Sequence, residues 1–144
     1  MNNKNNRIKV SIIDDSKAYR NSLRNILEAD RRICICDEYD SGTAFINVLD
    51  SNFQPDICLI DVVLKDMSGI ECAKKIKEKD PNIHIVIMTA CPNTESFSEA
   101  RKIGADYIEK GSRFEAIIDH IITKCSSSMN NNIRNSNQYK KSSR

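Results

Sequence analysis

Short apolar segments and amphipathic segments alternate five times along this chain, and that alternation limits its possible folds more than any other feature. The apolar segments have the length and the Val and Ile content of buried strands, and apolar residues recur at helical spacing between them. Parallel strands need crossover connections, which such helices supply. We therefore predict an α/β fold with helices on both faces of one parallel sheet. The predicted strands are residues 8–13, 33–36, 57–60, 83–88 and 106–109, and the predicted helices include residues 19–27, 44–49, 70–76, 94–103 and 117–125.

Two of these helices carry capping signals at their ends. Ser68 and Glu71 have the spacing of a capping box, with Ser68 as the N-cap. Gly104 follows the helix over residues 94–103 and suits a left-handed C-cap. Within that helix, Phe97 and Ala100 are expected to face the core.

The composition is that of an ordinary globular domain. The chain has 144 residues, of which 40% are hydrophobic and 29% charged, enough for one domain with its own core. The net charge is +2, but residues 126–144 hold four basic and no acidic residues, so residues 1–125 carry −2. That balance does not favour a nucleic-acid interface, and no apolar run is long enough to span a bilayer. We expect neither direct nucleic-acid binding nor membrane insertion.

The cysteines indicate the cellular compartment, and the chain ends indicate the limits of the folded domain. The six cysteines form no CxxC pair, and the polar N-terminus lacks the apolar stretch of a secretory signal. We interpret the thiols as small core residues in a reducing cytoplasm, with a metal or redox role as the less favoured alternative. Residues 1–6 are predicted to be a disordered leader, and residues 126–144 a disordered polar and basic tail.

Polar side chains stand at the ends of four predicted strands. Asp14 and Asp15 follow the first strand, Asp61 the third and Lys110 the fifth, and Thr89 ends the fourth. The carboxyl ends of parallel strands share one edge of a sheet, and ligands bind outside that edge. We therefore expect these five side chains to be neighbours.

The chemistry of these residues suits a metal ion and a phosphoryl group. Carboxylates this close repel one another unless a cation is present. Mg²⁺ is the favoured cation, because it takes one or two carboxylate oxygens and fills its shell with water or phosphate oxygens. A carboxylate can also act as the nucleophile of phosphoryl transfer. Asp61 is alone at its strand end, and is a better candidate for that role than the Asp14–Asp15 pair.

Four motifs at these strand ends resemble those of the receiver domain of two-component response regulators. They are Val-Ser-Ile-Ile-Asp-Asp at 10–15, Asp-Val-Val-Leu-Lys-Asp-Met-Ser-Gly-Ile-Glu at 61–71, Ile-Met-Thr-Ala at 87–90 and Gly-Ala-Asp-Tyr-Ile-Glu-Lys at 104–110. The resemblance covers residues 7–125, which would form the receiver domain. It implies a flavodoxin-like, doubly wound sheet of five parallel strands in the order 2-1-3-4-5, with five helices.

The resemblance also implies a metal and phosphorylation site. Asp61 would accept a phosphoryl group from the phosphohistidine of a histidine kinase or a phosphotransfer protein, with Mg²⁺ as the cofactor. Asp15 would bind the metal directly and Asp14 largely through water. The carboxylate of Asp61 and the backbone carbonyl of Val63 would be the other protein ligands.

Three further matched residues would form a switch. Thr89 would hydrogen-bond a phosphate oxygen once Asp61 is modified, and Lys110 would pair with the phosphate. Tyr107 falls where the family has its rotating aromatic residue, so Thr89 and Tyr107 would move together. The surface of the fourth helix, fifth strand and fifth helix would change, and a downstream protein, or a second copy in a phosphorylation-dependent homodimer, would bind it.

Two positions next to the site predict a long-lived phosphoryl group. Val63 and Cys91 stand two residues beyond Asp61 and Thr89, where the family has the side chains that flank the hydrolytic water. Neither side chain orients a water molecule well. We therefore predict slow autodephosphorylation.

Three functions remain open from the sequence. A stand-alone receiver, which catalyses only its own phosphorylation and dephosphorylation, accounts for all four motifs. A Mg²⁺-dependent phosphatase with an aspartyl phosphate intermediate is a second reading, although such enzymes usually carry an Asp-x-Asp arrangement that residues 61–63 lack. A fragment of a DNA-binding regulator is a third, and a reading frame continuing beyond Arg144 would establish it.

Overall fold

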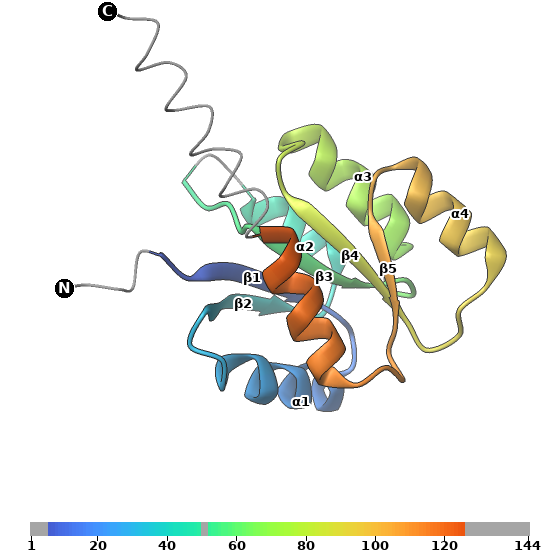
Figure 1. The fold of residues 1–144 in the computed structure, drawn as a ribbon. Helices are drawn as coiled ribbons and strands as arrows, with labels where there is room; N and C mark the ends of the chain where they lie inside the picture. Colours follow the sequence, from blue (N-terminus) through green and yellow to red (C-terminus); the bar gives the residue numbers. More distant parts are fainter. Residues whose placement is uncertain (1–5, 50–51, 126–144) are drawn as a thin grey trace, which may run out of the picture.

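The sheet at the centre of the molecule is the predicted one. The computed structural model describes residues 6–49 and 52–125, and within them five strands form one sheet in the order β2-β1-β3-β4-β5. All the pairings between neighbouring strands are parallel, and Figure 1 shows helices on both faces of the sheet. The strands are β1 (Ile8–Ile13), β2 (Ile33–Tyr39), β3 (Ile57–Asp61), β4 (His84–Thr89) and β5 (Asp106–Glu109).

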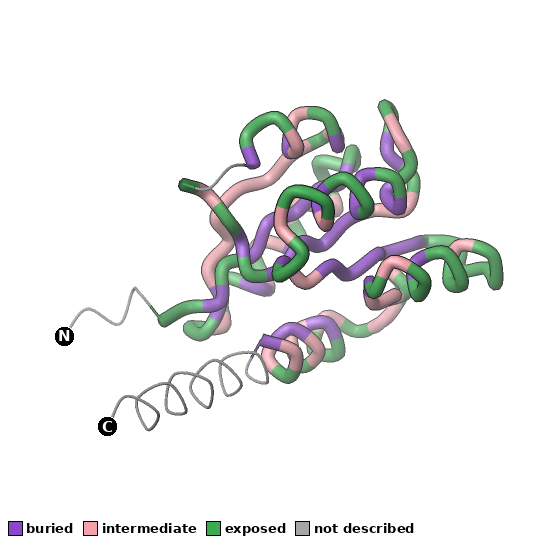
Figure 2. The backbone as a smooth tube through the Cα atoms, turned by 90° about the horizontal axis from the view of Figure 1, so that it is seen from above, coloured by how far each residue is buried: buried purple, intermediate pink, exposed green. Residues whose placement is uncertain are grey.

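The helices divide between the two faces of the sheet. They are α1 (Lys17–Glu28), α2 (Gly42–Val48), α3 (Gly69–Lys79) and α4 (Thr94–Lys102), followed by a helical segment over residues 114–125. On one face, Leu23 and Leu27 of α1 share an apolar cluster with Ile117 and Ile121 of the 114–125 helix. Residues of α2, α3 and α4 join the cluster on the opposite face. Burial follows the strands through the middle of the molecule (Figure 2), so both sheet faces are covered.

Three local predictions need correction. β2 runs to Tyr39 rather than to Cys36, because an edge strand tolerates polar residues, and Asp37 Oδ1 accepts a hydrogen bond of 2.6 Å from Ser11 Oγ. Phe97, expected in the core, is 45% exposed, whereas Ala100 is buried. Cys91 is also exposed. Other cysteines, Cys58, Cys72 and Cys125, are buried as expected.

The predicted helix caps are present. Ser68 is the N-cap of α3, and its side-chain oxygen accepts a hydrogen bond from the Ile70 N–H. Gly104 has φ +75° just after α4, in the left-handed region that favours glycine. Local capping therefore determines where α3 begins and where α4 ends.

The predictions for the chain ends fall mostly outside the described residues. The leader at residues 1–6 is described only at its last residue, and the tail at residues 126–144 is not described. None of the helices in the described part of the chain combines the length and the apolar character of a membrane span.

Candidate functional site

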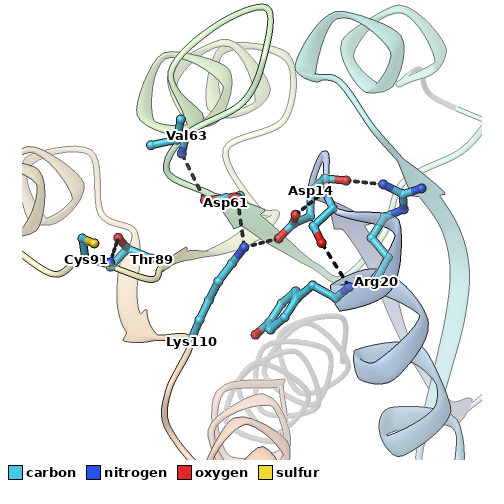
Figure 3. A network of polar contacts seen from close by, with 9 residues as sticks. Asp14, Arg20, Asp61, Val63, Thr89, Cys91 and Lys110 are labelled. Carbon is cyan, nitrogen blue, oxygen red and sulfur yellow. Dashed lines mark hydrogen bonds and ion pairs between the residues drawn. The ribbon is translucent and has the colours of Figure 1, made fainter.

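Lys110 joins the ends of two neighbouring strands. Its Nζ lies 2.5 Å from Oδ2 of Asp14, which follows β1, and 2.9 Å from Oδ2 of Asp61, which ends β3. The Lys110 side chain is 14% exposed and that of Asp14 is 3% exposed, so water is largely excluded from the pairing. Removal of the Lys110 ammonium would leave the buried Asp14 carboxylate without its ion-pair partner. Figure 3 shows Lys110 extending from beyond β5 to both carboxylates, as predicted for this sheet edge.

Backbone contacts hold Asp14 in place at the end of β1. Its Oδ1 accepts a hydrogen bond of 2.8 Å from the Ser16 N–H, and its carbonyl oxygen accepts one of 2.5 Å from Arg20 Nη1 (Figure 3). Arg20 in turn lies 3.7 Å from Glu38 at the end of β2. The first turn of α1 thereby fixes the direction of the Asp14 side chain.

Burial and ion pairing act in opposite directions on the pKa values of this pair. Burial raises the pKa of Asp14, although hydrogen bonds from Lys110 and the Ser16 N–H lower it in part. Burial acts to lower the pKa of Lys110, but hydrogen bonds to Asp14 and Asp61 outweigh it, so that the pKa of Lys110 is raised. Lys110 therefore faces the carboxylates as a cation at neutral pH.

Three carboxylates form a cluster that fits a hard metal ion. One oxygen each from Asp14, Asp15 and Asp61 lies within 4.8 Å of the other two. Asp14 is buried, Asp61 is partly buried and Asp15 is exposed, so the cluster opens to solvent on one side. Oxygen donors in this arrangement suit Mg²⁺ or Ca²⁺, and the single charge of Lys110 leaves an acidic balance that a divalent cation would neutralise.

A tight loop after β3 holds Asp61. The Val63 N–H donates a hydrogen bond of 3.1 Å to Asp61 Oδ1, and the Gly69 N–H donates one of 2.8 Å to the Val62 carbonyl. Val63 and Ser68 form an isolated antiparallel bridge that closes the loop. A Cβ on Gly69 would lie 2.0 Å from the Asp61 carbonyl oxygen, so this closure requires glycine. The Val63 side chain points outward and is 68% exposed (Figure 3).

Thr89 lies at the same edge and contacts the backbone. Its buried hydroxyl accepts a hydrogen bond of 3.1 Å from the Cys91 N–H, and its carbonyl accepts one of 2.8 Å from the Lys110 N–H. The second bond ties the backbone of Lys110 to the end of β4. Thr89 and Lys110 are therefore adjacent through their backbones at the predicted edge of the sheet.

Tyr107 in β5 contacts α4. Its hydroxyl oxygen lies 2.6 Å from Ser96 Oγ and accepts a hydrogen bond of 3.3 Å from the Asn93 N–H. Its ring meets Phe97 edge to face, with ring centroids 5.6 Å apart. The two rings line a shallow apolar groove of about 440 Å³ between α4 and β5.

Two residues of the site are not among those predicted for it. Arg20 and Tyr19 lie in the helix predicted over residues 19–27. Arg20 donates a hydrogen bond to the carbonyl of Asp14, and the Tyr19 ring centroid lies 4.3 Å from Lys110 Nζ. Their position in the first turn after the Asp pair was the available signal, because that turn begins at the sheet edge.

Known proteins are similar to this chain in sequence. Residues 10–122 match the response regulator receiver domain family. The chemotaxis protein CheY of Halobacterium salinarum is 35% identical over 113 residues, which cover 78% of this chain and 92% of that protein. Transcriptional regulatory protein YdfI of Bacillus subtilis is 32% identical over 76% of this chain but 51% of its own length. The chain thus spans nearly all of one relative and about half of another.

Solved structures confirm the predicted flavodoxin-like fold. A CheY-like response regulator receiver domain protein from Methanospirillum hungatei superposes with a TM-score of 0.75 at 23% identity, covering 87% of this chain and 98% of that one. The BeF3-activated DrrB receiver domain gives a TM-score of 0.70 at 24% identity, covering 84% and 98%.

Proposed function

The chain belongs to the response regulator receiver domain family, and from that premise we propose that Asp61 accepts a phosphoryl group from a phosphohistidine. The donor would be a histidine kinase or a phosphotransfer protein in a two-component phosphorelay. The observation that carries the proposal is the contact of Lys110 Nζ with Asp61 and Asp14, next to the third carboxylate of Asp15. This arrangement offers a nucleophile, a cation for the phosphate and oxygen ligands for a metal.

The acidic cluster supports a Mg²⁺ site within this proposal. Asp15 and Asp61 would bind the ion directly, Asp14 largely through water, and the Val63 carbonyl would be a further ligand. Bound Mg²⁺ would supply positive charge that screens the carboxylates and the phosphate oxygens from one another. Without positive charge there, three acidic groups would repel an incoming phosphoryl group.

The transfer step uses Asp61 as the nucleophile. A lone pair on an Asp61 carboxylate oxygen attacks phosphorus, the P–N bond to the donor imidazole breaks, and the imidazole keeps that electron pair and takes up a proton. Val63 N–H and Lys110 Nζ hold one carboxylate oxygen each, which orients Asp61 before attack. The product is an acyl phosphate on Asp61.

The new charge would then act on the switch residues. A phosphoryl group adds roughly one to two negative charges and new acceptor oxygens. Thr89 would exchange its bond with the Cys91 N–H for one to the phosphate, and Lys110 would pair with the phosphate. Tyr107 would then give up its contacts with α4, which changes the surface that a downstream protein or a second copy binds. Homodimer formation and the cytoplasmic location stay predictions.

A small phosphodonor tests this proposal directly. Incubation with acetyl phosphate and Mg²⁺ should add one phosphoryl group per chain, seen by intact mass and lost on treatment with hydroxylamine. A phosphatase would instead turn over many donor molecules without accumulating a product on the chain. Multiple turnovers, or no covalent product, would overturn the proposal. The length of the gene beyond Arg144 decides separately whether the domain is stand-alone.

Replacing Asp15 with Asn should weaken Mg²⁺ binding by at least about tenfold. Mutation of a residue that only hydrogen-bonds a metal ligand already causes a loss of that size, and Asp15 would be a direct ligand. Asp15 is exposed, so the free energy of unfolding should change little. Mg²⁺ titration followed by amide NMR shifts measures the affinity. Asp119→Asn makes the same charge change on the 114–125 helix and is the control. An unchanged affinity in Asp15→Asn would rule out the metal site.

Replacing Val63 with Asn should speed loss of the phosphoryl group by about fivefold, the effect of one added hydrogen bond to water. The side chain is 68% exposed, so Asn fits without repacking, and the backbone bond to Asp61 stays. Decay of the acyl phosphate after donor removal is the measurement. Val48→Asn, a 43% exposed valine in α2, is the control. Equal decay rates in wild type and Val63→Asn would refute slow hydrolysis caused by Val63.

A further inference from the structure

Tyr19 presents the face of its ring to Lys110. The centroid of the ring lies 4.3 Å from Lys110 Nζ, well within the range of a cation–π contact. The same Nζ lies 2.5 Å from Asp14 and 2.9 Å from Asp61. The ammonium group therefore has two carboxylates and one aromatic face as its neighbours.

Tyr19 makes further contacts through its backbone and through its ring. The Tyr19 N–H donates a hydrogen bond of 3.2 Å to Ser16 Oγ, the N-cap of α1, so the residue lies in the first helical turn. Its ring also lies 6.5 Å from that of Phe114, centroid to centroid, at the start of the 114–125 helix. The ring is thus close to both Lys110 and the 114–125 helix.

The Tyr19 hydroxyl takes no part in this contact. Within the described residues its Oη is buried and has no hydrogen-bond partner. Burial raises the pKa of Tyr19 to about 12, and the charges of Asp14 and Asp61 add to that shift, so the hydroxyl is neutral. An unpartnered buried hydroxyl is unfavourable, which leaves the ring as the favourable part of the residue.

We propose that Tyr19 is a positioning residue for phosphoryl transfer, whose ring holds the Lys110 ammonium against Asp61. This proposal rests on the proposed function of Asp61. The ring attracts the Lys110 ammonium but is not a ligand for Mg²⁺, which prefers oxygen atoms. The cation–π contact therefore persists when a divalent ion neutralises Asp14 and weakens its ion pair with Lys110. Lys110 then stays directed at Asp61, where the phosphate oxygens arrive.

The ring contact also joins the site to the helix over residues 114–125. Movement of Lys110 toward a phosphate would change its contact with Tyr19, whose ring also lies near that of Phe114. No ion pair is needed for this connection. It provides a physical path from the state of Asp61 to the helix that covers the α1 side of the sheet.

Two substitutions of Tyr19 distinguish the effect of its aromatic ring from the effects of its hydroxyl and its apolar bulk. Tyr19→Phe keeps the aromatic face and removes the unpartnered hydroxyl, whereas Tyr19→Leu keeps apolar bulk and removes the aromatic face. Tyr39→Leu is the matched control, because Tyr39 is also partly buried and its ring packs on that of Phe45 at 5.4 Å. Unfolding of all three variants by urea measures any general loss of stability.

NMR of the unphosphorylated full chain reports the contact itself. Ring currents should shift the Lys110 Cε protons upfield in wild type, Tyr19→Phe and Tyr39→Leu, and this shift should vanish in Tyr19→Leu. With acetyl phosphate and Mg²⁺, Tyr19→Leu should be phosphorylated about fivefold more slowly, from the loss of one partly desolvated cation–π contact. Tyr19→Phe should match wild type in rate and be no less stable.

The outcomes distinguish this inference from the proposed function. Wild-type Lys110 shifts or a wild-type rate in Tyr19→Leu would overturn the positioning role, as would a Tyr19→Phe variant that behaves like Tyr19→Leu. An equal slowing in Tyr39→Leu would also overturn it, because the effect would then follow stability rather than the contact. Absence of phosphorylation in wild type, with the expected Lys110 shifts, would refute the function of Asp61 and leave the contact established.

Discussion

Replacing Asp61 with Asn should abolish covalent capture of a phosphoryl group. An amide oxygen lacks the charge that lets a carboxylate oxygen attack phosphorus. Asn has the shape of Asp but one acceptor oxygen, so it keeps only one of the two hydrogen bonds that Asp61 accepts, from the Val63 N–H and from Lys110 Nζ. The variant should fold normally, because Asn removes one of three neighbouring acidic groups and Lys110 keeps its bond with Asp14. Intact mass after incubation with acetyl phosphate and Mg²⁺ measures the loss, and circular dichroism checks the fold.

Asp66→Asn is the matched control for this experiment. Asp66 lies in the same loop after β3, but its carboxylate accepts hydrogen bonds from Gly42 N–H and from Thr43, at the start of α2. These bonds hold the pKa of Asp66 below its usual value, with the Thr43 hydroxyl as the largest cause. Loss of this charge should lower stability slightly and leave phosphorylation intact. Wild-type labelling of Asp61→Asn would place the acceptor at another residue and refute the assignment.

The strands were predicted well where both faces of the sheet are buried. Buried apolar residues predominate in β1, β3 and β4, and the observed bounds of these strands differ from the predicted ones by at most one residue at each end. β2 extends beyond its apolar run, since an edge strand with one neighbour accommodates Asp37 and Glu38. Phe97 follows the helical spacing but faces the groove beside Tyr107, because an aromatic ring at that place gains contacts outside the core.

The proximity of Asp14, Asp61 and Lys110 could be predicted from the sheet topology alone. Parallel strands place their carboxyl ends at one edge, so residues far apart in sequence become neighbours without any local signal. The contact of Tyr19 with Lys110 could not be predicted that way. It depends on the distance from α1 to the end of β5, which side-chain packing on the sheet sets and no residue spacing encodes.

Gly69 is a second contact that spacing does not reveal. It opens α3 and is buried against the end of β3, where an added Cβ would lie 2.0 Å from the carbonyl oxygen of Asp61 and 3.0 Å from Cα of Val62. Both neighbours are backbone atoms, which cannot turn away as a side chain can. The close approach joins the start of α3 to the residue that we propose is phosphorylated.

Replacing Gly69 with Ala should therefore lower the free energy of unfolding by about 3 kcal/mol, at the upper end of the usual range for overpacked sites. The helix preference of Ala over Gly is worth about 1 kcal/mol at most and cannot offset this loss. The loop must also open, so Asp61 and the Val63 N–H would shift and phosphorylation by acetyl phosphate should slow. Urea unfolding and intact mass measure the two effects.

Gly111→Ala distinguishes this steric effect from a general intolerance of glycine replacement. A Cβ at Gly111 would come no closer than 3.7 Å to another atom, the end of the Glu109 side chain. That variant should differ from wild type by about 0.5 kcal/mol or less. If Gly69→Ala were as stable as Gly111→Ala, β3 and α3 would have room between them. The tight closure of the loop would then not be what holds Asp61 toward Lys110.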